Sequence, residues 1–86
     1  MGITFDANKN ARNIEPRGLS FERAAETDLE QAITVIDDRR NYGEIRYRAF
    51  GPLDGRLHVL VYTEALNGIR VISLRRANKR EVKRYG

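Results

Sequence analysis

Two runs rich in β-branched residues, separated by an Asn-Gly pair, constrain the fold of this chain most strongly. Arg56–Thr63 alternates its apolar residues between two faces, and Ile69–Leu74 follows the turn signal Asn67-Gly68. β-Branched residues favour strands, and Asn-Gly favours a tight reversal between strands that pair side by side. The sequence therefore predicts an antiparallel hairpin in the middle of a sheet.

Basic residues gather directly after the second run. From Arg75 to Gly86 there are six basic residues and one acidic residue, Glu81, whereas the rest of the chain contains ten basic and eleven acidic residues. Cations stabilise the C-terminal end of a helix, so a solvated helix face is one interpretation of this cluster. A concentrated positive charge also attracts polyanions. We therefore expect a nucleic acid, or an acidic protein that covers the same surface, as partner.

A short strand and a helix are predicted at the N-terminus. Ile3–Phe5 has the composition of a strand, and Asp6 is the expected N-cap of a helix over Ala7–Ile14. Pro16 disfavours helical geometry at the residue before it, and Gly18 permits a left-handed turn. These two residues are expected to end the helix.

A second helix is predicted over Phe21–Thr27, with Ser20 as its N-cap. Its inward-facing residues are expected to be Phe21, Ala24 and Ala25. The next segment, Asp28–Gln31, is compatible with a longer helix or with an irregular connection.

The remaining elements complete one α+β domain over residues 1–86. Ile33–Ile36 and Ile45–Phe50 are predicted strands, and Gly51–Gly55 is a predicted hairpin loop with its turn at Asp54-Gly55. A C-terminal helix is predicted over Ala77–Tyr85. The expected order is β-α-α-β-β-β-β-α, in which two N-terminal helices pack on a curved antiparallel β-meander.

Arginines and tyrosines on adjacent predicted strands suggest a phosphate-binding surface. Arg46 and Arg48 share one strand face, and Arg75 follows the end of another strand. Arginine binds phosphate with two parallel hydrogen bonds, and tyrosines such as Tyr62 stack on unpaired bases. A meander is expected to bring Arg46 and Arg75 onto one concave surface.

Several classes of protein are excluded or disfavoured. The absence of cysteine excludes disulfides and thiolate metal sites, and the single histidine, His58, excludes histidine-rich zinc chemistry. His58 lacks a local partner, which favours a structural or simply exposed histidine over a catalytic base. Asp37-Asp38 is neutralised by Arg39-Arg40. No metal or cofactor is expected, and without a signal segment or a membrane-spanning run the expected location is the cytoplasm.

Five stretches together resemble the BrnT family, the toxin halves of bacterial type II toxin–antitoxin pairs. They are ITFDANKNARN, RGLSFERAAE, DDRRNYGEIRYRAFG, GRLHVLVYT and IRVISLRRANKREVKRY. The family is similar in fold to RelE-type ribonucleases, small α+β toxins that cut RNA without a metal ion. The resemblance implies an RNA substrate and a BrnA-like antitoxin. That antitoxin resembles a ribbon-helix-helix DNA-binding protein, so operator DNA is contacted only through it.

The resemblance also implies a set of site residues. Matching family positions are Lys9, Glu44, Arg46 and Arg75. Glu44 is the expected base or orienting group, Arg46 and Arg75 the expected phosphate stabilisers, and Lys9 a group for substrate binding or proton donation. Further RNA-binding residues are expected to be Arg17, Arg48, Tyr62, Arg76 and Lys79.

The chain departs from the family pattern at several positions. Family members usually have Lys-His-Gly where this chain has Pro16-Arg17-Gly18, and often an arginine where it has Ala65. Thr27–Gln31 lacks the usual aromatic and proline pattern. Arginine stays protonated and cannot replace a proton-transferring histidine. A module that binds RNA or antitoxin without cleavage is therefore the alternative. A DNA-binding regulator is a third, although no helix-turn-helix pattern is present.

Overall fold

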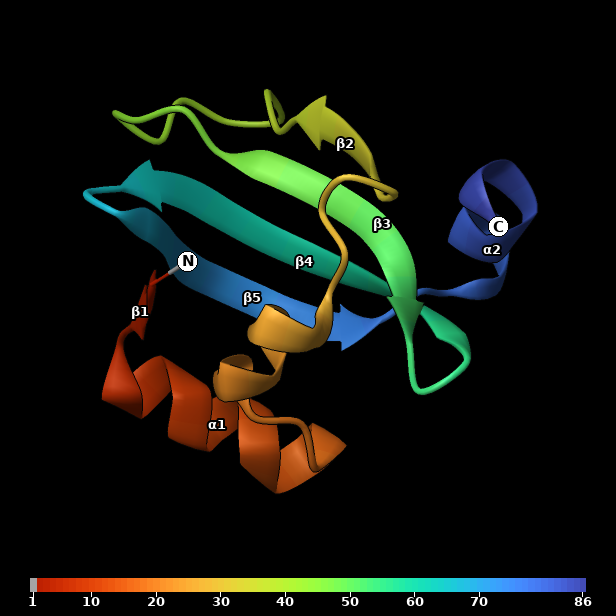
Figure 1. The fold of residues 1–86 in the computed structure, drawn as a ribbon, viewed down its shortest axis with the longest axis horizontal. Coiled ribbons are helices and arrows are strands. Elements are labelled where there is room, and N and C mark those ends of the chain that lie inside the picture. The colour runs from red at the N-terminus through yellow and green to blue at the C-terminus, as the bar shows by residue number, and fades with distance from the viewer. Residues whose placement is uncertain (1) are drawn as a thin grey trace.

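The computed structural model describes residues 2–86, with the backbone alone for residues 15–17. Five strands form one sheet in the order β1-β5-β4-β3-β2. Their bounds are β1 Gly2–Phe5, β2 Ile33–Ile36, β3 Tyr47–Leu53, β4 Arg56–Ala65 and β5 Gly68–Arg76. Helix α1 (Ala7–Arg17) and the 3-10 helix η1 (Phe21–Glu26) lie against one face of the sheet, and α2 (Lys79–Tyr85) lies beside β3, away from α1 and η1 (Figure 1).

The predicted α+β class and the order of the elements are confirmed, but the sheet is mixed and not purely antiparallel. β1 pairs in parallel with β5, from Gly2 opposite Gly68 to Phe5 opposite Val71. The other three pairings are antiparallel. The first strand takes the free edge of β5, and the chain then crosses the sheet through α1 and η1. A sequence pattern of period two shows that a strand exists but not which neighbour it pairs with.

The central hairpin is confirmed, whereas the predicted hairpin loop before it is too long. β3 continues through Gly51 and Pro52 to Leu53, which is buried, and only Asp54 and Gly55 turn. Both have positive φ, 54° and 73°, as a tight two-residue turn between twisted strands requires. Pro52 and Gly51 suggested a loop, but burial of the alternate residues keeps this segment in the sheet.

The first helix is longer than predicted. Asp6 caps α1 as expected, accepting from the backbone N–H groups of Asn8 and Lys9 at 2.8 and 3.1 Å. α1 then continues past the predicted end at Ile14 to Arg17. Gly18 ends it in a left-handed conformation, with its N–H donated to the Ile14 carbonyl. The glycine cap, and not the proline, therefore sets the end of the helix.

The second helix is a 3-10 helix and not an α-helix. Ser20 caps it as predicted, accepting from Glu22 N at 3.3 Å. Phe21 and Ala24 are buried as predicted, but Ala25 is exposed. A 3-10 helix has three residues per turn, so residues 21 and 24 share a face and residue 25 turns away from it. The ambiguous segment after it is an irregular connection, with turns at residues 29–31.

The C-terminal helix starts two residues later than predicted. Ala77 N–H donates to the Leu57 carbonyl at 2.9 Å and so continues the pairing of the sheet. Asn78 caps α2, and its side chain and that of Glu81 form a reciprocal capping box. Tyr85 stacks on Phe50 with ring centroids 3.9 Å apart. These contacts dock a helix of only seven residues, too short to be stable alone.

Two apolar clusters lie on opposite faces of the sheet. The larger one faces α1 and η1 and contains Leu19, Phe21, Ala24, Ala49, Leu53, Leu60, Ile69, Val71 and Leu74. The smaller one contains Phe50, Val59 and Val61, with Tyr85 packed against it. The alternation predicted for β4 is thereby confirmed. The second face is only partly covered, which leaves its polar side chains open to a partner.

Candidate functional site

Four arginines belong to the sheet face that α1 and η1 leave uncovered, which we call the arginine face. They are Arg46, Arg48, Arg70 and Arg75. Their neighbours along the strands are directed toward the larger apolar cluster on the helix side. Tyr47 and Ala49 flank Arg48, Ile69 and Val71 flank Arg70, and Leu74 precedes Arg75. Alternation of side chains in a strand therefore places the four on the opposite face.

Glu44 connects two of these arginines. Its carboxylate accepts from Arg46 Nε at 2.9 Å and from Arg70 Nη2 at 2.8 and 3.0 Å. Arg46 also lies 4.2 Å from the centre of the Tyr42 ring. The hydrogen bond from Arg46, with the charge of Arg70, lowers the pKa of Glu44 below its usual range. The carboxylate is therefore ionised at neutral pH and holds both guanidinium groups in place.

Arg75 is bound to the C-terminal helix. Its Nη1 and Nη2 donate to the two Glu81 carboxylate oxygens at 2.7 and 2.9 Å. This paired hydrogen bond, assisted by the Asn78 backbone N–H, lowers the pKa of Glu81 to about 2. One glutamate thus both caps α2 and anchors it to β5.

Arg48 lies next to this pair and has the least satisfied guanidinium of the face. Within the described residues its buried Nε has no hydrogen-bond partner. The guanidinium carbon is 5.8 Å from the centre of the Phe50 ring. Its charge also contributes to the low pKa of Glu81. A buried donor without a partner is costly, so an anion that reaches Arg48 gains a favourable contact.

The structure places Arg46 and Arg75 on one face but not at one point. Arg70 on β5 donates to Glu44, as Arg46 does. In the sequence Arg70 is five positions before Arg75. Five residues of strand span roughly 16 Å. Arg46 and Arg75 are therefore spaced to contact different phosphates of an extended ligand and not a single phosphate.

The other predicted site residues are distributed over the molecule. Lys9 is exposed on α1, in the layer across the sheet from the arginine face. Tyr62 stacks on Tyr47, with centroids 5.4 Å apart, and packs against the helix-side cluster. Lys79 is exposed in the first turn of α2, and the side chain of Arg17 lies outside the described part of the structure. In the described structure Lys9, Tyr62 and Lys79 make no contact with Glu44.

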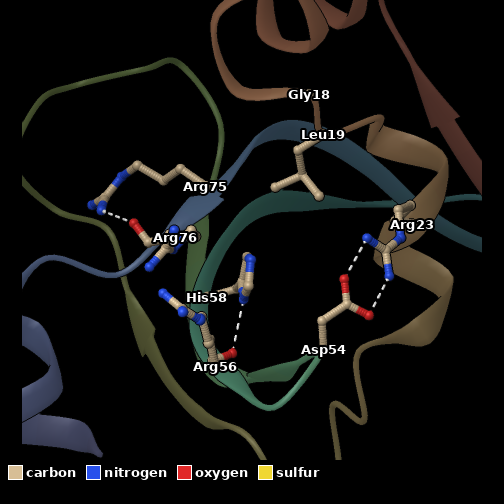
Figure 2. A pocket seen from close by; sticks show the side chains of 8 residues that line it. All are labelled: Gly18, Leu19, Arg23, Asp54, Arg56, His58, Arg75 and Arg76. Atoms are coloured by element: carbon tan, nitrogen blue, oxygen red, sulfur yellow. Dashed lines mark hydrogen bonds and ion pairs between the residues drawn. The ribbon is translucent and has the colours of Figure 1, made fainter.

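Arg76, the remaining predicted RNA-binding residue, lies in a pocket that was not predicted from the sequence. The pocket has a volume of about 620 Å³ and is lined by Gly18, Leu19, Arg23, Asp54, Arg56, His58, Arg75 and Arg76. Figure 2 shows His58 between Arg56 and Arg76 on one side and the Arg23–Asp54 pair on the other. His58 is 6% exposed, so it is buried and not simply exposed. The only sign of this pocket in the sequence was that Arg56 and His58, two residues apart on a predicted strand, share one face of it.

Of the adjacent charged residues Asp37, Asp38, Arg39 and Arg40, Asp37 and Arg39 form an ion pair. The Asp37 carboxylate is buried and accepts from Arg39 at 2.7 Å and from Tyr42 at 3.2 Å. The hydrogen bonds from Arg39 lower the pKa of Asp37 to about 2. Among the described residues there is no group of three histidine, aspartate or glutamate side chains placed to bind a metal ion. None of the described helices has the length and apolar character required to cross a membrane.

Comparison with known proteins assigns the family. Residues 5–81 match the model of a family described as the ribonuclease toxin BrnT of type II toxin–antitoxin systems. A comparison with curated proteins found no match. The matched region includes α1, the whole of β2 to β5 and the Glu81 anchor of α2. Since the match spans nearly the entire chain, this protein belongs to the BrnT family of ribonuclease toxins.

Proposed function

We propose that the protein is a metal-independent endoribonuclease toxin of the bacterial cytoplasm that binds RNA phosphates on the arginine face. The observation that supports this most is the Glu44 cluster, in which one ionised carboxylate holds Arg46 and Arg70 in fixed positions. Preorganised cations stabilise the charge that develops on a phosphate during cleavage. Arginines supply here the positive charge that a bound metal ion provides in other nucleases.

The proposed reaction uses the substrate's own ribose. The 2′-hydroxyl oxygen attacks the adjacent phosphorus and gives up its proton to water, and the bond from phosphorus to the 5′-oxygen breaks. The leaving 5′-oxygen takes up a proton from water, so the products end in a 2′,3′-cyclic phosphate and a 5′-hydroxyl. Arg46 and Arg48 stabilise the negative charge on the phosphate, and Arg75 holds a neighbouring phosphate. The lowered pKa of Glu44 makes it a weak base, which supports an orienting role for it over proton abstraction.

The test measures cleavage of labelled RNA in EDTA by purified wild-type protein and by Arg46→Ala and Arg75→Ala. We expect the wild type to cleave and Arg46→Ala to lose roughly 10²-fold or more in rate, as for removal of one transition-state donor. Arg75→Ala is expected to cleave more slowly because it binds the RNA more weakly through the neighbouring phosphate. Arg40→Ala is the matched control, because Arg40 is exposed and makes no ion pair in the described part of the chain. Cleavage by folded Arg46→Ala at the wild-type rate would reject the proposed site.

Glu44→Gln separates the two roles of Glu44. If Glu44 orients Arg46 and Arg70, the variant cleaves more slowly but keeps the shape of the wild-type pH–rate profile. If Glu44 is the base, the acidic limb of the profile disappears with the carboxylate. Cleavage rates of both proteins measured from pH 4 to pH 9 distinguish the two roles, and loss of that limb would contradict the orienting role.

A binding module without cleavage is the second candidate, supported by the position of the histidine. The only imidazole of the chain, His58, lies in the pocket on the helix side of β4 and not on the arginine face. In the described structure the arginine face therefore lacks the commonest proton-transfer group. Growth distinguishes the candidates: induction of an active toxin alone arrests cells, whereas soluble, harmless overexpression supports the binding module.

The antitoxin is proposed to be a BrnA-like ribbon-helix-helix protein that acts by covering the arginine face. An acidic or amphipathic segment complements the charge of Arg46 and Arg48 and excludes RNA from them. Arg46→Ala and Arg48→Ala are thus expected to weaken antitoxin binding as well as RNA binding. A complex that leaves the arginine face fully exposed would contradict this mode of inhibition.

A further inference from the structure

The pocket around His58 has the polar groups of an anion site that the proposed cleavage does not use. Arg56 and His58 are two residues apart on β4 and share a face, and the register of the sheet sets Arg76 of β5 directly opposite His58. η1 and the β3–β4 turn close the other side of the pocket through Arg23 and Asp54 (Figure 2). Three basic side chains from two strands therefore converge on one cavity.

The charge of this pocket is not balanced within it. Asp54 is the only acidic residue of the lining, and it is already occupied by two hydrogen bonds of 2.7 Å from Arg23. Arg56 and Arg76 form no ion pair in the part of the chain that the structure describes. The volume of about 620 Å³ is within the range of small-molecule sites. The pocket is thus suited to an anion that brings its own negative charge.

His58 supplies a directional contact inside the pocket. Its Nδ1 lies 2.8 Å from the Arg56 carbonyl oxygen, and since a carbonyl only accepts, Nδ1 must be the nitrogen that donates. This hydrogen bond fixes the ring orientation and leaves Nε2 without a partner among the described residues. In the neutral ring Nε2 is an acceptor, so it can receive a hydrogen bond from a nucleobase N–H.

Consecutive arginines connect the pocket with the arginine face. Arg75 is opposite Val59 and Arg76 is opposite His58, so their side chains project to the two faces of the sheet at the end of β5. Figure 2 shows the Arg75 side chain directed away from His58, with Nη1 at 3.3 Å from the Arg76 carbonyl. An RNA strand that passes the end of β5 can therefore contact Arg75 with one phosphate and Arg76 with the next.

We propose that the His58 pocket binds a nucleotide of the RNA outside the cleavage site, with its phosphate on Arg56 and Arg76 and its base on His58 Nε2. The proposal rests on the proposed RNA-binding function. Phosphate matches the two guanidinium forks, and hydrogen bonds to charged groups are among the strongest in proteins. The pocket then extends the substrate contact beyond the cleavage site and contributes to the choice of RNA sequence.

The test uses a fluorescent 2′-O-methyl RNA tetranucleotide, which has no free 2′-hydroxyl and so binds without being cleaved. We expect Arg56→Gln and Arg76→Gln each to weaken its binding roughly tenfold, as for loss of a charged hydrogen bond. Arg40→Gln removes the same charge from the loop at the other end of β3 and is expected to change affinity by less than about twofold. Equal affinities of Arg56→Gln, Arg76→Gln and Arg40→Gln would overturn the proposal.

Nuclear magnetic resonance locates the contact, because His58 is the only histidine and its ring signals need no assignment. The wild-type imidazole signals are expected to shift on addition of the tetranucleotide and, at higher concentration, of inorganic phosphate. Unchanged signals at saturating tetranucleotide would overturn the proposal, and signals that shift with phosphate but not with the tetranucleotide would reject RNA as the ligand. If the His58 signals shift but the protein cleaves no RNA, only the nuclease proposal is rejected. If the protein cleaves RNA but the His58 signals stay unchanged, only the proposal for the His58 pocket is rejected.

Discussion

At the scale of single residues, ion pairs between arginine and a carboxylate organise the molecule. Glu44, Asp37 and Glu81 each accept from an arginine at 2.7 to 2.9 Å. Exposed ion pairs contribute little to stability, so their role depends on how far they are buried and on what they position. Asp37 fixes the loop after β2, Glu44 fixes two guanidinium groups on the arginine face, and Glu81 attaches α2 to β5.

Glu81 makes stability depend on pH in a defined range. Its pKa falls from the ordinary 4.5 to about 2 in the folded state, mainly because of Arg75. A depressed folded pKa adds stability above the unfolded pKa, and this stability is lost as the pH falls from 4.5 toward 2. With solvent screening, we expect Glu81→Gln to cost about 1–2 kcal/mol at neutral pH.

Urea unfolding of wild type and Glu81→Gln between pH 7 and pH 2 checks this expectation. The difference in the free energy of unfolding should be constant above pH 5 and should shrink at lower pH, as the wild-type carboxylate is protonated. Glu30→Gln is the control, because Glu30 is exposed and forms no ion pair in the described structure. A difference that stays constant down to pH 2 would contradict the low pKa of Glu81.

At the scale of elements, the contact that the sequence predicted least is the parallel pairing of β1 with β5. It depends on close approach of two glycines, since a Cβ atom at Gly68 would lie 1.9 Å from the Gly2 carbonyl oxygen. Backbone atoms on both sides cannot move apart without breaking this pairing. We therefore expect Gly68→Ala to lower the free energy of unfolding by about 2 kcal/mol or more.

Gly2→Ala is the matched control for Gly68→Ala. A Cβ atom at Gly2 lies 3.2 Å from the Asn67 carbonyl oxygen, a tight contact that a shift of a few tenths of an ångström relieves. It should therefore cost clearly less stability than Gly68→Ala in the same urea titration. Equal stabilities of the two variants would show that the edge strand does not depend on the close approach at Gly68.

Local patterns predicted the elements well and their contacts incompletely. Capping side chains at Asp6 and Ser20, and alternation in β4, act over a few residues and are visible in the sequence. The end of α1, the 3-10 geometry of η1 and the start of α2 depend on tertiary contacts, such as that of Ala77 with Leu57. Such contacts join residues distant in the sequence, so periodicity alone does not reveal them.

The candidate site was predictable to a similar degree. Alternation correctly placed Arg46 and Arg48 on one face, and the sequence identified Glu44 as a candidate. The contact of Arg70 with Glu44 depends on the pairing of β4 with β5, and the contact of Arg75 with Glu81 depends on the docking of α2. Neither contact was predicted. The His58 pocket depends on the register that sets His58 opposite Arg76. A one-residue change of register would have separated these two side chains.

At the scale of the whole molecule, the basic C-terminal segment is divided among three surfaces. Arg75 contributes to the arginine face, Arg76 to the His58 pocket, and Lys79 with the following basic residues to the exposed side of α2. The charge that appears as one cluster in the sequence therefore surrounds the end of β5. This distribution suits a long, flexible polyanion better than a small anion held in one site.

The most direct test of metal-independent cleavage at this surface is the chemical identity of the RNA ends produced by purified protein in excess EDTA. Attack by the 2′-hydroxyl predicts fragments that end in a 2′,3′-cyclic phosphate and begin with a 5′-hydroxyl, which mass spectrometry identifies directly. Fragments with 3′-hydroxyl and 5′-phosphate ends, or cleavage that stops in EDTA and returns with added Mg²⁺, would contradict the mechanism proposed for the arginine face.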